Sequence, residues 1–125
     1  MFRRVLFRSR AEYARRTPRV SWVEEGGGQA KPVTDSFRLV HRRRLSQSGE
    51  RTLIASIIPP GAAIVNTCIA TNFRGLGEMI AMGASLGSLP LDFFIKSTGR
   101  GDLYGEGLSQ IPLLTATAAD RKSVV

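Results

Sequence analysis

The sequence predicts an α+β fold: a small sheet of three to four strands packed on a long helix that Pro90 kinks or divides. Two patterns lead to this prediction. Residues 37–58 are rich in β-branched and alternating apolar residues, which favour strands. Residues 75–97 repeat apolar residues at three- and four-residue spacing, which favours a helix. The order strand, strand, strand, helix is typical of a small α+β domain.

The first strand is predicted over residues 37–44. It alternates in part, with Phe37 and Leu39 on one face, and it becomes basic at its end. The polar residues 46–50 then predict a turn.

The second strand is predicted over residues 51–58 and is the strongest candidate, because β-branched residues dominate it. We expect it to be buried on both faces. It ends at Pro59, since proline cannot donate to a ladder. Residues 62–70 predict a further strand, or two short ones around Asn66.

The helix is predicted over residues 75–97. Pro90 either kinks it or starts a second helix at Ser88. Gly99 is expected to cap its C-terminal end, where the charge of Lys96 is favourable. The predicted core combines apolar residues of the second strand and the helix: Leu53, Ile54, Ile57, Ile58, Ile80, Leu86, Leu89 and Phe93.

Residues 10–36 predict a polar, loop-rich segment that precedes a recognition domain over residues 37–114. Three glycines, Gly26 to Gly28, favour a loop because they carry no side chain to pack. They lack the following Lys-Ser/Thr of a phosphate-binding P-loop. Within this segment, residues 19–23 alternate enough to predict a short strand.

The formal net charge of +8 is distributed unevenly. Residues 1–9 and 121–125 hold five basic and no acidic residues, and the remainder holds 13 basic and 10 acidic residues. Both ends resemble translated sequencing-adapter artefacts at the edges of metagenomic reading frames. We therefore expect residues 1–9 and 115–125 to be disordered and the chain to be an incomplete domain. A basic presequence is the alternative for the start.

Several kinds of site are disfavoured by the residues available. The single cysteine, Cys68, cannot form an internal disulfide, which suggests a reducing cytoplasm. No apolar run approaches 18 residues, so we expect no membrane span. The lone His41 has neither a second imidazole nor a nearby carboxylate, so a structural role or a phosphate contact is more plausible than a metal site or a triad. We expect no catalytic, cofactor or metal site.

The strongest chemical feature is a group of five arginines within fourteen residues: Arg38, Arg42, Arg43, Arg44 and Arg51. Arginine offers a rigid fork of donors that fits phosphates and guanine edges. Arg42, Arg43, Arg44 and Arg51 are therefore candidate DNA contacts, followed by Lys96 and Arg100 in the loop after the helix. The alternative is a solvated surface whose arginines pair with carboxylates.

Four segments of the sequence resemble segments of large adenine-specific DNA methyltransferases of the type IIG and related phage-defence families, and they occur in the same order as in that family. They cover roughly residues 37–114. The pieces are the segment Glu50-Arg-Thr-Leu-Ile-Ala-Ser-Ile-Ile-Pro-Pro-Gly61, the pair Asn66-Thr67, the helix and loop from Leu86 to Gly101, and the closing Leu108-Ser-Gln-Ile-Pro-Leu113.

The resemblance implies a target-recognition region that binds duplex DNA, within a restriction–modification enzyme that uses S-adenosylmethionine. The family's catalytic domain carries an Asn/Asp-Pro-Pro-Tyr/Phe motif that holds the flipped adenine. Here Ile58-Pro-Pro-Gly61 shares only the two prolines. The resemblance therefore implies a methyltransferase parent whose catalytic domain would be this region's partner, and no catalytic or cofactor-binding motif within these 125 residues.

Two alternatives remain open. The same strands could be a scaffold that packs against the catalytic domain of that enzyme. The chain could also be an unrelated small basic protein that binds RNA or ribosomes, although such a surface normally uses aromatic stacking platforms.

Overall fold

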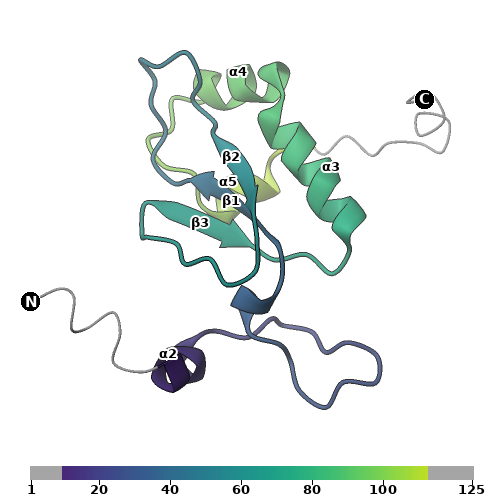
Figure 1. The fold of residues 1–125 in the computed structure, drawn as a ribbon. Helices are drawn as coiled ribbons and strands as arrows, with labels where there is room; N and C mark the ends of the chain where they lie inside the picture. The colour runs from purple at the N-terminus through teal and green to yellow at the C-terminus, as the bar shows by residue number, and fades with distance from the viewer. Residues whose placement is uncertain (1–9, 113–125) are drawn as a thin grey trace, which may run out of the picture.

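The computed structural model describes residues 10–112, and its strands form one three-stranded antiparallel sheet (Figure 1). The strand order is β2-β1-β3, so β1 is central. The strands are β1 (Arg38–Arg42), β2 (Ala55–Ile58) and β3 (Cys68–Thr71). With the helices described below, they confirm the predicted α+β class. The predictions for residues 1–9 and 113–125 lie outside the described residues.

The register of β1 decides which side chains share a face of the sheet. Leu39 lies opposite Ile57 of β2 and Thr71 of β3, whereas Val40 lies opposite Ser56 and Ala70. Because successive side chains alternate, Leu39 belongs to one face and Val40 to the other. We call them the helix face, against which α3 packs, and the outer face.

Two helices follow β3. They are α3 (Leu76–Gly87) and α4 (Leu89–Ser97), and they meet at an angle of 64°. Ser88 occupies the N-cap of α4, and Pro90 lies in its first turn, where a missing N–H breaks no helical hydrogen bond. Of the two alternatives predicted for Pro90, a kink or a second helix starting at Ser88, the structure shows the second. Gly99 follows α4 with φ of 66°, as the predicted C-terminal cap requires.

A glycine lets α3 approach the sheet closely. A Cβ at Gly83 would lie 3.4 Å from Leu39 Cδ1 and 3.8 Å from Ile57 Cδ1. The core forms between this helix, α4 and the helix face. Its buried residues are Leu39, Leu45, Leu53, Met79, Leu86, Leu91, Ile95, Leu103 and Ile111.

The predicted core was right for Leu53 and Leu86, each 1% exposed, and Ile58 is half-buried. It was wrong for five residues with exposed side chains: Ile54, Ile57, Ile80, Leu89 and Phe93. The first two lie in or beside β2, which is an edge strand and not buried on both faces. In the helices, the break at Ser88 resets the helical phase, so α4 buries Leu91 and Ile95 while Leu89 and Phe93 point outward.

The strands are shorter than predicted because the flanking backbone has other partners. The N–H groups of Thr52 and Leu53 donate to the Asp92 carboxylate instead of a strand. In the predicted third strand, a turn precedes β3, with Cys68 N donating to Val65 O at 3.0 Å. β2 therefore begins at Ala55 and β3 at Cys68, and beyond them only Ile54 O and Thr67 O still accept from Arg42 N and Arg43 N among the described residues.

The segment before the sheet contains α2 (Arg10–Arg16) and the 3-10 turn η1 (Val33–Asp35). The strand predicted over residues 19–23 is reduced to one bridge between Arg19 and Pro32. The glycine loop is a turn, in which Gly27 N donates to Glu24 O at 2.9 Å. A last short helix, α5 (Gly105–Ser109), lies near the end of the described chain.

Within residues 10–112, no single helix has both the length and the hydropathy needed to cross a membrane. Among the helices of this described part, only α3 and α4 taken together reach these values, and they do so across their 64° bend.

Candidate nucleic-acid interface

Three consecutive arginines lie where β1 ends, and they point in different directions. Arg42 is the last residue of β1, and it lies opposite Cys68. Alternation places Arg42 on the outer face and Arg43 on the helix face. Arg44 then forms a bridge with Asp102, supported by Leu103 N donating to Arg43 O at 2.8 Å. Pairing with the loop after α4 therefore fixes the backbone of Arg43 and Arg44, whereas the backbone of Arg42 pairs within the sheet.

Arg42 and Arg44 are the exposed cations of this group. The side chain of Arg42 makes no hydrogen bond or ion pair with any residue in the described range 10–112. The side chain of Arg44 is 76% exposed, and its Nε lies 4.0 Å from Asp102 Oδ1. An exposed pair at this distance contributes little to stability. Both guanidinium groups are therefore accessible to an anion from outside the molecule.

Arg43 combines with two residues that the sequence did not indicate as site residues. Its Nη1 donates to Asn66 Oδ1 at 3.1 Å, and its guanidinium lies 5.9 Å from the centre of the Tyr104 ring. Tyr104 is 52% exposed. A guanidinium over an aromatic ring gains a cation–π interaction, and an exposed ring can also stack on a base. Tyr104 lies beside Arg43 because residues 101–103 pair with residues 43–45.

Arg100 lies in the loop that carries this pairing. Its Nη2 donates to Gln110 Oε1 at 2.6 Å, and its carbonyl accepts from Gln47 Nε2 at 2.9 Å. The neighbouring Gly101 accepts from Leu45 N. The predicted site residues Arg42, Arg43, Arg44 and Arg100 are thus brought to one region, which we call the arginine end.

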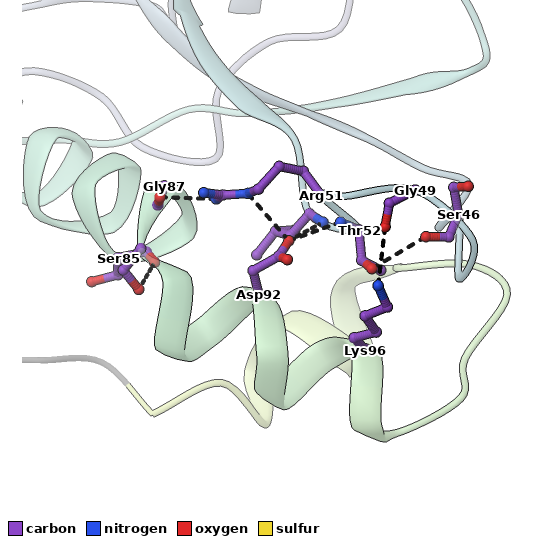
Figure 2. A network of polar contacts seen from close by, with 10 residues as sticks. Ser46, Gly49, Arg51, Thr52, Ser85, Gly87, Asp92 and Lys96 are labelled. Atoms are coloured by element: carbon purple, nitrogen blue, oxygen red, sulfur yellow. Dashed lines mark hydrogen bonds and ion pairs between the residues drawn. The ribbon is translucent and has the colours of Figure 1, made fainter.

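The other two predicted residues, Arg51 and Lys96, belong to a different network (Figure 2). Arg51 Nη2 donates to Gly87 O at 2.9 Å, and its Nε lies 3.6 Å from Asp92 Oδ1. Lys96 Nζ donates to Gly49 O at 3.0 Å. Both cations therefore hold the polypeptide around residues 46–53 against α3 and α4.

Asp92 is the centre of that network. It is 5% exposed, and its Oδ1 accepts from Thr52 N at 2.9 Å and from Leu53 N at 2.6 Å. Figure 2 shows this carboxylate in α4 facing the extended backbone that leads into β2. A buried carboxylate is tolerated where it is hydrogen-bonded and paired, and Asp92 meets both conditions.

His41 is a structural residue. It is 2% exposed, and its Nε2 lies 3.2 Å from Leu103 O. Burial lowers the pKa of the imidazole, and this outweighs the opposite effect of the hydrogen bond to Leu103. The neutral ring donates from Nε2 and links β1 to the loop after α4. This geometry supports the structural role, because the ring is not accessible to a phosphate.

Residues 10–112 contain no group of three or more His, Cys, Asp or Glu side chains that could hold a metal ion. No family model, curated protein or solved structure matches the chain.

Proposed function

We propose that the chain is a DNA-recognition region of an adenine-specific DNA methyltransferase and that its arginine end contacts duplex DNA. The resemblance of residues 37–114 to that enzyme family motivates the choice of DNA. S-adenosylmethionine and the methyl transfer would belong to a catalytic domain of the parent enzyme.

The observation that carries the proposal is the availability of Arg42 and Arg44. Both are exposed, and no carboxylate lies closer than 4.0 Å to either among the described residues. Arginines in such positions can neutralise phosphates, which supply affinity without choosing a sequence. Around the intervening Arg43, Asn66 and Tyr104 offer an amide and an aromatic ring of the kinds that contact bases.

The salt dependence of duplex binding tests the proposal. Each phosphate contact contributes about −0.9 to the slope of log affinity against log salt concentration. The double variant Arg42→Ala/Arg44→Ala should therefore make the slope less negative by about 2 if each arginine neutralises one phosphate.

The matched control is Arg15→Ala/Lys31→Ala, which removes two exposed cations that pair with carboxylates far from the arginine end in sequence. The control should leave the slope nearly unchanged. Equal slopes for wild type and for the Arg42/Arg44 variant would refute the proposed interface. A single-stranded RNA of the same length serves as a further arm, since tighter binding to it than to the duplex would favour the RNA-binding alternative.

The scaffold alternative is favoured by a separate observation. Four large apolar side chains of α3 and α4 are 52–74% exposed: Leu76, Ile80, Leu89 and Phe93. Apolar helix surfaces of this kind are common where another domain packs. A duplex affinity that is unaffected by both double variants would support this role instead.

A further inference from the structure

An arginine of β1 is buried without a carboxylate partner. Arg38 is 3% exposed, and its Nη2 donates to the carbonyl of Ala62. Its Nε has no hydrogen-bond partner, and the guanidinium forms no ion pair with any residue between 10 and 112. Arg51, in contrast, has a carboxylate partner, because Asp92 Oδ1 lies 3.6 Å from its Nε. A buried charge without a counter-ion is costly unless something outside the chain compensates it.

Arg38 borders the outer face of the sheet, where a cavity of about 450 Å³ opens. Polar groups around this cavity come from Arg16, Thr17, Thr34 and Asn72, and apolar contacts come from Ile64 and Ala70. The guanidinium of Arg16 is already paired with Glu12, since its Nε donates to Glu12 Oε1 at 2.6 Å. No carboxylate is among the described residues that line the cavity. Its volume lies within the range typical of small-ligand sites, about 300–1,000 Å³.

Hydrogen bonds between its own walls hold the cavity in shape. Gly61 N donates to Thr34 O at 2.8 Å, and the φ of Gly61, 80°, is one that glycine adopts without strain. Asn72 Nδ2 donates to Val33 O at 2.9 Å and to Ser36 Oγ at 2.8 Å. The loop after β2, the turn before β1 and the end of β3 are thus tied together, so the cavity exists before any ligand binds.

We propose that this cavity is a phosphate-binding site in which Arg38 supplies the positive charge. Guanidinium groups bind phosphate through parallel N–H donors. The anion would compensate the charge of Arg38, and the apolar wall would contact the group that carries the phosphate. The site is separate from the arginine end and does not depend on the proposed function.

The same phosphate chemistry has two possible sources, a free small phosphate ester and the backbone of DNA. The probes are inorganic phosphate and a short duplex, added to the full chain in phosphate-free buffer of constant ionic strength. We expect inorganic phosphate to shift the Arg38 Nε–H resonance saturably and to raise the melting temperature. Displacement of phosphate by the duplex would identify the DNA backbone as the source, and its failure would identify a small phosphate ester.

Two variants make the test specific. Arg38→Met should abolish the phosphate-dependent rise in melting temperature, and without phosphate it should be at least as stable as wild type, because it removes an uncompensated charge. Ala70→Leu retains Arg38 but fills the cavity, so it should also lose the response. It serves as the test if Arg38→Met does not fold.

The control Arg15→Met removes an exposed arginine that does not line the cavity, and it should respond as wild type. Absence of a saturable shift, or a normal phosphate response in the folded Arg38 and Ala70 variants, would overturn the proposal. The outcome is independent of the Arg42/Arg44 experiment, so the two proposals can fail separately.

Discussion

The buried carboxylate of Asp92 should be the most sensitive polar position outside the hydrophobic core. Replacing it with alanine leaves the N–H groups of Thr52 and Leu53, two residues that are each 1% exposed, without their acceptor. The same change removes the carboxylate beside Arg51. Asp92→Asn retains an oxygen in nearly the same place and removes only the charge.

The expected cost follows from the two hydrogen bonds. An unsatisfied buried donor costs about 1–3 kcal/mol, so Asp92→Ala should lower the free energy of unfolding by about 3–5 kcal/mol. Hydrogen bonds to a charged group contribute roughly 1 kcal/mol more than neutral ones, so Asp92→Asn should cost about 2 kcal/mol. The larger loss is a substantial fraction of the roughly 5–15 kcal/mol that stabilises a typical domain.

Urea unfolding followed by circular dichroism measures both variants. Glu25→Ala, which removes an exposed carboxylate, is the control and should change the free energy of unfolding by less than about 0.5 kcal/mol. A cost for Asp92→Ala below about 1 kcal/mol, or no greater than that of Asp92→Asn, would show that these hydrogen bonds do not stabilise the fold as argued.

Three further outcomes are expected in urea unfolding, and the third is also checked by duplex binding. Burial lowers the pKa of His41 from 6.5, so on acidification the imidazole is protonated more readily in the unfolded chain than in the folded one. The free energy of unfolding should therefore fall as the pH drops below about 6.5. The variant His41→Gln should reduce this pH dependence. Gly77→Ala should stabilise by about 0.5–1 kcal/mol because nothing lies within 4 Å of the added Cβ, whereas Gly107→Ala should destabilise because its Cβ would lie 2.9 Å from Leu103 Cδ1. Arg51→Ala and Lys96→Ala should each cost about 1 kcal/mol and leave the salt slope of duplex binding unchanged, since both side chains bond within the molecule.

Local patterns predicted the fold class because they reflect local physics. The division of the helix follows from Pro90, which fits only the first turn of a helix, and the end of α4 follows from Gly99. The burial of individual side chains did not follow, since a bend of 64° changes which side of the second helix faces the core. The core prediction treated residues 75–97 as one helix with a single buried face. Because the helix is broken at Ser88, Leu89 and Phe93 do not continue that face and are exposed.

The candidate site depends on long-range pairing that no local pattern contains. The sequence ranked Arg42, Arg43, Arg44 and Arg51 ahead of Lys96 and Arg100, yet the fold separates these six residues by their neighbours instead. Asp92 is brought to Arg51 by the packing of α4, and the loop after that helix brings Tyr104 to Arg43. Arg38, which drew attention only as part of a charge cluster, becomes the buried cation of a cavity because residues 61–64 fold over the outer face. In this fold the function of an arginine therefore depends less on its local charge density than on whether the chain supplies it with an anion.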